Sequence, residues 1–278
     1  MKKFQVALQL YSVRDEMAKD MESALRAVKA MGYDYVEFAG YYNHAAEDIR
    51  RMLDEIGLEC VSVHQGYDVF LKNGEAEAAF LKTIGAKYCA VPWMGPERHK
   101  GSDAFEQTLR DFTAVSRILK AAGIQLLYHN HDFEFETVDG KYKLDWLYEA
   151  LPADVLQTEI DTCWVRYAGE DPATYLRKYA GRSPVVHLKD FTSSRLNGGP
   201  VYALIDDKGN AGETEQAEAA NDFRFQPLGM GLQDFPAILA AAEDAGSSTV
   251  VVEQDDSPDR PSLEAARISR EYLKALGL

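Results

Sequence analysis

Four residues of the chain have the types and the spacing that suit a divalent metal ion. They are three carboxylates and one imidazole: Glu134, Asp161, His187 and Glu253. Successive members lie 27, 26 and 66 residues apart. This mixture of ligands suits Mn²⁺, Mg²⁺, Co²⁺ or Zn²⁺. A bound ion polarises a carbonyl oxygen, so Glu134 and Glu253 are also the candidate catalytic bases beside it.

Polar and aromatic side chains lie at the ends of other short apolar runs. Four of the six histidines have this position, which a scattered surface distribution would not produce. Such side chains suit a small polyhydroxylated ligand, with aromatic rings as a wall against a sugar ring. The candidate substrate-binding residues are Tyr11, Glu37, His64, Trp93, His129, His131, Trp164 and Lys189.

Each of these residues also has a purely structural interpretation. Asp161 could cap a helix or pair with Arg166, and Glu253 could pair with Lys189. His187 could be a core histidine bonded to a backbone carbonyl, and aromatic residues at strand ends usually belong to the core. Taken singly, each is more simply explained by structure. Four candidate ligands at the ends of successive runs favour a functional site.

The elements that must position these residues follow a repeating pattern. A glycine stands between an amphipathic segment and the next apolar run at Gly32, Gly57, Gly85, Gly123, Gly181 and Gly246. Glycine just past a helix accepts the left-handed conformation that ends the helix. The runs are short, rich in Val, Ile and Tyr, and mostly without alternation, which is typical of parallel strands buried on both faces.

The segments between the runs have a helical period. One apolar stripe is formed by Phe105, Leu109, Phe112, Val115 and Leu119, and a second by Ile268, Tyr272, Leu273 and Leu276. Asp171 followed by Pro172 predicts a helix start.

With the run at 6–10 and the one leading into Asp161, the pattern gives eight strands alternating with helices. Eight such units predict an α/β protein, with one (β/α)8 TIM barrel as a single domain over residues 1–278. A doubly wound open sheet is the alternative, and it is weakened because no GxGxxG turn follows the first run.

Residues 192–228 interrupt this rhythm with a polar segment that contains Gly and Asn. It separates the seventh strand from its helix. Active sites of such barrels lie at the carboxyl ends of the strands. We therefore expect an extended loop after strand 7 that covers the catalytic face.

Composition limits the classes of partner. The formal net charge of −15 opposes binding to a nucleic-acid backbone. No run approaches the ~20 apolar residues that span a bilayer, and the first residues lack the features of a signal peptide. Cys60, Cys89 and Cys163 are isolated, which suits a reducing compartment. We expect a cytoplasmic enzyme with a small sugar or polyol substrate, without nucleic-acid or membrane partners; a homo-oligomer stays open.

Six motifs in order along nearly the full chain carry a family resemblance: LQLYSVR, YHNHDFEF, EIDTCW, VVHLKD, PLGMG and VVVEQD. Together they resemble the sugar phosphate isomerase/epimerase family of the xylose isomerase-like TIM barrels. In that group, one divalent metal is held by Glu, Asp, His and Glu from the last four strands. The resemblance therefore implies Glu134, Asp161, His187 and Glu253 as the ligands of one ion.

Two departures from the family pattern matter. Many relatives place the first metal glutamate on the strand, in a pattern like LENH, where this chain has YHNH with His129. The YHNHxxEF pattern is similar to members that supply the carboxylate later, which favours Glu134. A ligand or base role for His129 or His131 stays open. The three-zinc DNA-repair relatives have a motif like DTCH where this chain ends in Trp164, which argues against DNA repair.

The resemblance implies a metal-dependent sugar isomerase or epimerase. Such an enzyme removes a proton beside a carbonyl of a keto sugar or polyol and passes through an enediolate. The YHNH stretch is similar to the inosose dehydratase side of the group, so a lyase acting on a keto-polyol or 3-keto sugar is the main alternative. A non-catalytic sugar-binding barrel is the other. The native metal, the sugar and its phosphorylation stay open.

Overall fold

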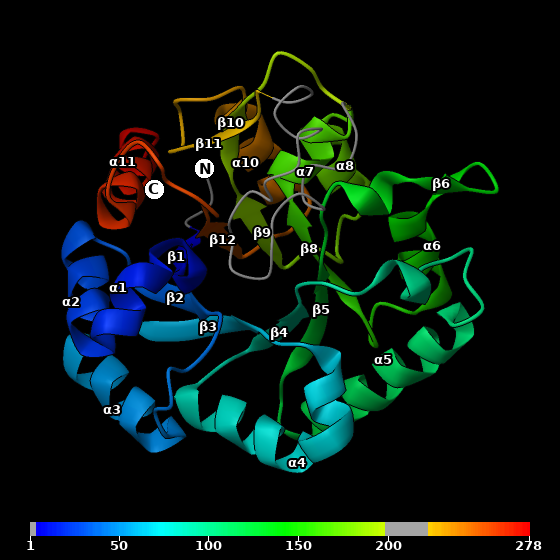
Figure 1. Ribbon diagram of the computed structural model, residues 1–278, viewed down its shortest axis with the longest axis horizontal. Coiled ribbons are helices and arrows are strands. Elements are labelled where there is room, and N and C mark those ends of the chain that lie inside the picture. Colours follow the sequence, from blue (N-terminus) through cyan, green and yellow to red (C-terminus); the bar gives the residue numbers. More distant parts are fainter. Residues whose placement is uncertain (1–3, 198–221) are drawn as a thin grey trace.

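The eight apolar runs form one closed barrel of parallel strands, as the sequence predicts (Figure 1). The computed structural model describes residues 4–197 and 222–278. The order around the barrel is β1-β12-β9-β8-β5-β4-β3-β2, so the first and last strands are neighbours and the open-sheet alternative is excluded. The barrel strands are β1 (Gln5–Gln9), β2 (Tyr35–Phe38), β3 (Glu59–His64), β4 (Tyr88–Val91), β5 (Gln125–His129), β8 (Gln157–Asp161), β9 (Val185–Leu188) and β12 (Thr249–Val252).

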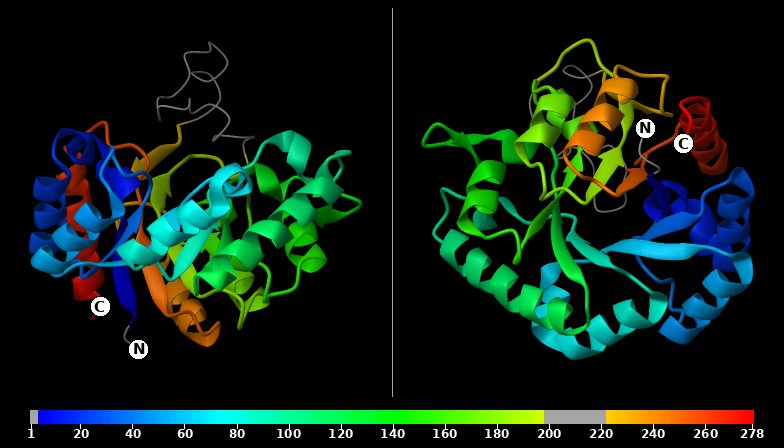
Figure 2. Two further views of the ribbon diagram at one scale, coloured as in Figure 1. Left: turned by 90° about the horizontal axis from the view of Figure 1, so that it is seen from below. Right: turned by 180° about the vertical axis from the view of Figure 1, so that it is seen from behind.

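Helices surround the barrel on the outside (Figures 1 and 2). They are α1 (Arg14–Lys19), α2 (Met21–Met31), α3 (Ala46–Ile56), α4 (Tyr67–Ile84), α5 (Phe105–Ala121), α6 (Lys143–Ala150), α7 (Thr162–Tyr167), α8 (Pro172–Lys178), α10 (Phe235–Asp244) and α11 (Ser262–Ala275). Single 3₁₀ turns occur at η1 (Leu10–Val13), η2 (Pro96–Arg98) and η3 (Phe133–Phe135). None of the helices in the described ranges is long and apolar enough to cross a membrane.

The local signals in the sequence correspond to real boundaries. The six predicted closing glycines all have positive φ, as in Gly57 at 79° after α3. Asp171 caps α8 by accepting a hydrogen bond from the Thr174 amide. On α5, Phe105, Phe112, Val115 and Leu119 of the predicted stripe are buried. The six glycines precede β2, β3, β4, β5, β9 and β12, and so mark where these strands begin.

The barrel interior changes from apolar to polar along the strands. Its apolar layer consists of Ala7, Val61, Ala90, Leu127, Val185 and Val251. In a strand, residues two positions apart face the same side. Two positions after Leu127, Val185 and Val251 come His129, His187 and Glu253, so the next inward layer is polar.

Two small antiparallel sheets extend from the barrel. β6 (Thr137–Val138) pairs with β7 (Lys141–Tyr142), and β10 (Asp190–Thr192) pairs with β11 (Arg224–Gln226). The second pair joins the two ends of the predicted 192–228 insertion after β9. The middle of that insertion, 198–221, lies outside the described residues, and with it the predicted cover of the catalytic face.

Candidate metal centre at the barrel mouth

Four adjacent strands bring a set of metal-ligating side chains together. β5, β8, β9 and β12 follow one another around the barrel. His129 ends β5, Asp161 ends β8, His187 lies in β9 and Glu253 directly follows β12. Asp161 and His187 are partners in the β8–β9 register. The parallel arrangement places these four side chains at the same end of the barrel.

The four side chains form one compact cluster, which we call the upper set: His129, Asp161, His187 and Glu253. One ligand atom from each lies within 4.8 Å of every other. His129 Nε2 is 3.6 Å from Asp161 Oδ2, and His187 Nδ1 is 2.9 Å from Glu253 Oε2. All four residues are buried, with exposed fractions of 5% or less. Two imidazoles and two carboxylates are a donor set that suits Mn²⁺, Co²⁺ or Zn²⁺.

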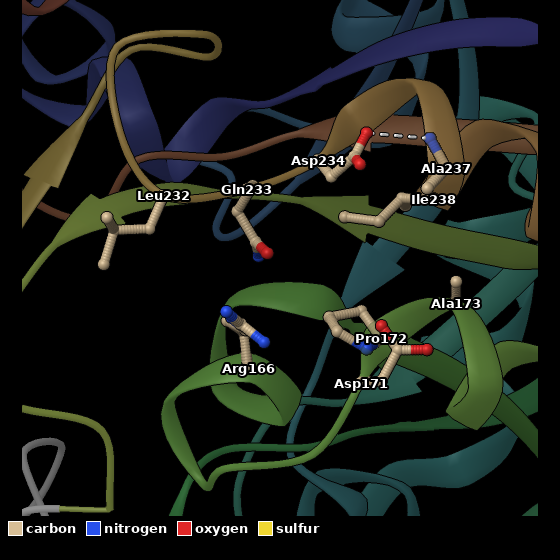
Figure 3. Close-up of a pocket in the computed structure, with 9 residues that line it drawn as sticks. All are labelled: Arg166, Asp171, Pro172, Ala173, Leu232, Gln233, Asp234, Ala237 and Ile238. Atoms are coloured by element: carbon tan, nitrogen blue, oxygen red, sulfur yellow. Dashed lines mark hydrogen bonds between the residues drawn. The ribbon is translucent and has the colours of Figure 1, made fainter.

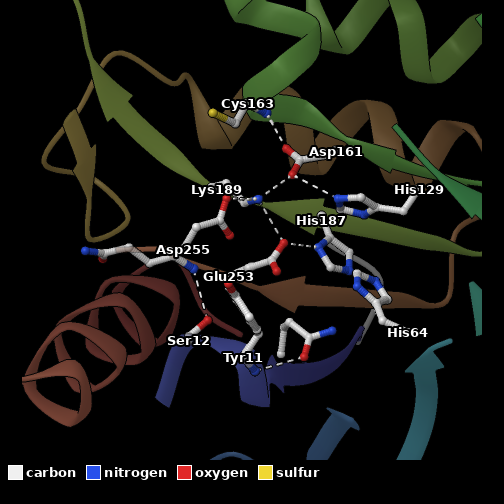
Figure 4. A network of polar contacts seen from close by, with 12 residues as sticks. Tyr11, Ser12, His64, His129, Asp161, Cys163, His187, Lys189, Glu253 and Asp255 are labelled. Carbon is white, nitrogen blue, oxygen red and sulfur yellow. Dashed lines mark hydrogen bonds and ion pairs between the residues drawn. The ribbon is translucent and has the colours of Figure 1, made fainter. Parts of the chain in front are cut away.

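A lysine ammonium lies against the same carboxylates (Figure 4). Lys189 Nζ is 3.0 Å from Asp161 Oδ2, 2.9 Å from Glu253 Oε2 and 3.0 Å from Asp255 Oδ2. Burial opposes the lysine charge, but Asp161 and Asp255 outweigh it and raise the pKa of Lys189 well above its ordinary value. Burial likewise opposes the charge on Glu253, yet Lys189 and His187 hold its pKa below its usual range. The upper set is therefore a place where positive charge is stabilised.

A second polar group lies on the other side of the His129 and His187 rings. Glu159 Oε2 is 2.7 Å from His64 Nε2, 3.3 Å from His129 Nδ1 and 3.4 Å from His187 Nε2. Glu37 Oε1 is 2.8 Å from His187 Nε2 and 3.1 Å from His64 Nε2. Both carboxylates are fully buried.

Proton affinities differ sharply across this interior. Burial disfavours the charged form of His64, but Glu37 and Glu159 outweigh it and raise its pKa to about 10. Burial and the neighbouring Glu37 raise the pKa of Glu159 to about 7. Burial, reinforced by nearby cations, holds the pKa of His129 and His131 well below 6.5. His129 is therefore neutral at pH 7, which is the form that binds a metal.

The structure does not bring Glu134 into the upper set. Glu134 lies in η3, where Oε1 accepts a hydrogen bond from the Tyr128 hydroxyl at 2.5 Å. Oε2 accepts one from the His131 amide at 2.8 Å. Burial raises the pKa of Glu134 to about 8. Its carboxylate thus closes the turn after β5, and His129 occupies the place beside Asp161 for which the sequence suggested Glu134.

Six of the eight predicted substrate-binding residues lie in this polar interior or close to it. Glu37, His64, His129 and Lys189 belong to the polar interior just described. His131 and Trp164 lie close to it, with ring centroids 5.8 Å apart and Lys189 Nζ 5.3 Å from the Trp164 ring.

Trp164 is also fully buried and stacks on Phe223, so it belongs to an apolar cluster as well as to the site wall. Tyr11 is partly buried under Arg14, whose guanidinium carbon lies 4.2 Å from its ring centroid. Trp93 is 49% exposed beyond the end of β4.

Two site residues were missed in the sequence. Glu159 precedes Asp161 by two positions in β8, and Asp255 follows Glu253 by two positions. The alternation of side chains along a strand puts Glu159 on the same face as Asp161. That signal was available in the motif EID, since a carboxylate two residues before a predicted ligand also points into the barrel.

A separate cleft lies beside the barrel, between α7, α8 and the beginning of α10 (Figure 3). Its polar lining includes Arg166, Asp171 and Asp234. The two aspartates accept hydrogen bonds from the Thr174 and Ala237 amides as helix caps. The cleft contains no member of the upper set, and its acidic groups are already used by the helices.

Comparison with known proteins agrees with the barrel fold. The sequence profile of the xylose isomerase-like TIM barrel family matches residues 25–276, and the chain belongs to this family. It is similar to the inosose dehydratase of Mesomycoplasma hyopneumoniae strain 7448, with 24% identity over 92% of this chain and 88% of that protein.

Solved structures share the fold. A sugar phosphate isomerase/epimerase from Parabacteroides distasonis has a TM-score of 0.77 and 23% identity, over 98% of both chains. The IOLI protein, whose crystal structure contains a bound zinc atom, has a TM-score of 0.69 and 15% identity, over 98% of this chain and 97% of that one.

Proposed function

We propose that the protein is a metal-dependent enzyme that removes a proton next to a carbonyl group of a keto sugar or polyol. The observation that carries the proposal is the upper set: two imidazoles and two carboxylates, buried and mutually within 4.8 Å, on four adjacent strands. The zinc atom in the related IOLI structure gives independent support for a divalent ion in this family.

In this proposal His129 takes the place of Glu134 as the ligand from β5. Asp161, His187 and Glu253 remain ligands as the sequence suggests. The donor atoms fit an ion because Asp161 Oδ2 is buried, already lies 3.0 Å from the Lys189 ammonium, and is therefore placed to interact with positive charge. Glu134 acts indirectly, since its bond to the His131 amide fixes the turn that presents His129 and His131.

In this proposal the metal ion, Glu253 and the residues around them have separate roles in the reaction. A divalent ion in such a set serves as a Lewis acid for a carbonyl oxygen. Glu253, ionised because Lys189 and His187 hold its pKa low, is in the form that accepts the proton. In this proposal Lys189 donates to a substrate hydroxyl group, His131 donates to or accepts from another, and Trp164 provides an apolar wall.

The fate of the proton determines the product. Return of the proton to the neighbouring carbon gives an isomer, and delivery to the opposite face gives an epimer. Loss of a β-hydroxyl group from the same carbanionic state gives dehydration. Dehydration is the second candidate, and it is supported by the related proteins named inosose dehydratase.

Glu253→Gln tests the proposal because the amide keeps an oxygen for the ion but does not accept a proton as a carboxylate does. With Mn²⁺ present, ketohexoses, ketopentoses, inososes and 3-keto sugars are screened by proton exchange from deuterated water. We expect exchange with at least one substrate, reduced by ~10² to 10⁴ in the variant. Metal content is measured on the same samples.

Glu149→Gln is the matched control, because Glu149 is an exposed surface residue and its replacement leaves the mouth intact. Normal exchange by Glu253→Gln at full metal occupancy would transfer the base role to another residue, with His131 next to test. Absence of both exchange and bound metal in the wild type would contradict enzymatic function and favour a sugar-binding role.

A further inference from the structure

Two imidazoles stand between two different groups of ligands. His187 directs Nδ1 to Glu253 Oε2 at 2.9 Å and Nε2 to Glu37 Oε1 at 2.8 Å. His129 directs Nε2 toward Asp161 Oδ2 at 3.6 Å and Nδ1 toward Glu159 Oε2 at 3.3 Å. Each ring therefore offers one nitrogen to the upper set and the opposite nitrogen to the interior below it.

The interior group has the composition of a metal site of its own. We call it the lower set: His64, His129, Glu159 and His187. One ligand atom from each lies within 4.8 Å of every other. His64 Nε2 and Glu159 Oε2 are 2.7 Å apart, and the rings of His64 and His187 stack with centroids at 5.2 Å.

A separate observation concerns two buried carboxylate oxygens, one on Glu159 of the lower set and one on Glu37 beside it. Glu159 Oε1 and Glu37 Oε2 are buried and accept no hydrogen bond in the part of the chain that the structure describes. Both residues are fully shielded from solvent. Buried carboxylate oxygens without partners are unfavourable, and a cation relieves that penalty.

We propose that the lower set is a second binding site, for a zinc-like divalent ion, and that it excludes an ion from the upper set. A neutral imidazole has one nitrogen with a free lone pair, while the other carries the proton. An ion in the lower set takes Nδ1 of His129 and Nε2 of His187. The N–H groups then point at the upper set, which loses two of its four ligands.

The two sets differ in the metals that they prefer. Three imidazoles and one carboxylate suit tetrahedral Zn²⁺. The upper set has a larger share of oxygen ligands, which are better suited to Mn²⁺. The inference rests on the proposed function only for the role of the upper set. It adds that zinc in the lower set prevents the upper set from binding its ion.

The test separates the two sets by substitution. Asp161→Asn with Glu253→Gln removes both carboxylates of the upper set and leaves every lower ligand in place. We expect this double variant to bind one Zn²⁺ per chain in equilibrium dialysis. Adding Glu159→Gln to it should weaken zinc binding by about 100-fold or more. Adding Ser62→Ala instead, a buried non-ligating change in β3, should not.

A second measurement checks exclusion in the unaltered protein. The wild type should bind one ion per chain at saturation, and Zn²⁺ should release bound Mn²⁺ in a one-for-one exchange. Co²⁺ in the double variant should give the strong visible absorption of a tetrahedral site. If Glu159→Gln does not fold, His64→Gln in the same background provides the equivalent loss of a ligand.

The outcomes also distinguish this inference from the proposed function. Failure of a folded double variant to bind zinc would overturn the lower site. Two ions bound together in the wild type would overturn the exclusion. Zinc retained by the double variant, with no Mn²⁺-dependent proton exchange in the wild type, would remove the proposed function and leave the lower site standing.

Discussion

Lys189 is the residue on which the charge balance of the mouth depends most. Its ammonium lies within 3.0 Å of oxygens from Asp161, Glu253 and Asp255, and it is 1% exposed. Two of these oxygens, on Asp161 and Glu253, belong to the proposed ion site. A bound divalent ion and the ammonium therefore act on the same carboxylates.

We expect Lys189→Met to destabilise the metal-free protein by about 3–5 kcal/mol, because three buried carboxylates lose their shared cation. Added Mn²⁺ should then raise the melting temperature more in the variant than in the wild type, since the ion replaces the missing charge. Thermal unfolding with chelator and with Mn²⁺ measures both effects. Lys19→Met, at an exposed pair with Glu16, is the control and should change neither. An equal metal response in variant and wild type would argue against a shared site.

Three of the four proposed ligands are predictable from the sequence, and the fourth is not. Asp161, His187 and Glu253 were predicted to converge because each ends or follows a buried strand. Glu134 was predicted as the fourth ligand, but η3 turns its carboxylate back toward Tyr128. No local signal in YHNHDFEF specifies that turn. Which of the neighbouring side chains faces the ion depends on tertiary contacts.

Among the elements, the loop between β11 and α10 depends on a single carboxylate. Asp190 Oδ2 accepts hydrogen bonds from the Gly229 and Gly231 amides at 2.9 Å, and Oδ1 accepts one from the Gln233 amide at 3.2 Å. This carboxylate therefore shapes the glycine-containing PLGMG segment beside the mouth. A Cβ at Gly231 would lie 2.4 Å from the Phe191 carbonyl oxygen, which shows how closely the loop approaches β10.

Asp190→Asn should loosen this loop, because an amide has one accepting oxygen in place of two. We expect a loss of about 1–3 kcal/mol in the free energy of unfolding, as buried amide donors lose their acceptor. Hydrogen exchange should accelerate at the amides of Gly229, Gly231 or Gln233. Asp171→Asn is the matched control, since asparagine is as good a helix cap as aspartate. Unchanged exchange in this loop would show that the carboxylate is dispensable.

The segment between β4 and α5 contains a histidine that should make stability depend on pH. His99 is 2% exposed, and Nε2 lies 3.2 Å from the Met94 carbonyl oxygen. Burial lowers the pKa of His99 from 6.5 to about 4. Between these values the unfolded chain binds a proton that the folded chain does not, so stability falls as the pH falls.

This histidine should contribute a loss of up to about 3 kcal/mol between pH 6.5 and pH 4. His99→Gln keeps a donor for Met94 but has no titrating group. The free energy of unfolding in urea, measured for both proteins across this range, should fall less steeply in the variant. Parallel curves would mean that His99 does not titrate as its burial implies.

The elements themselves were largely predictable because their signals are local. Six of the eight barrel strands are short apolar runs after a glycine, and these features need no knowledge of distant contacts. The sequence does not predict that Glu37, His64 and Glu159 form one layer inside the barrel, although Glu37 and His64 are predicted site residues. Their approach depends on how the strands from β2 to β9 close around one axis.

For the whole molecule, an ion in the upper set would join four of the eight barrel strands. Such an ion stabilises the folded state by about 2.7 kcal/mol at a hundredfold excess over its dissociation constant. We expect hydrogen exchange to slow most in β5, β8, β9 and β12, and less in β2, β3 and β4. Mass-spectrometric exchange with and without Mn²⁺ measures the difference. Uniform protection of all eight strands would indicate a general effect on unfolding in place of a local one.

The distribution of the ligands along the chain has a consequence for rates. Glu253 lies 92 residues after Asp161 and 124 after His129. Contacts this distant in sequence require the closure of long loops, so the complete set forms only when the barrel is nearly assembled. Interactions absent from the folding transition state slow unfolding and leave the folding rate almost unchanged. The ion would therefore lower the rate at which the barrel unfolds and leave the rate at which it folds almost unchanged.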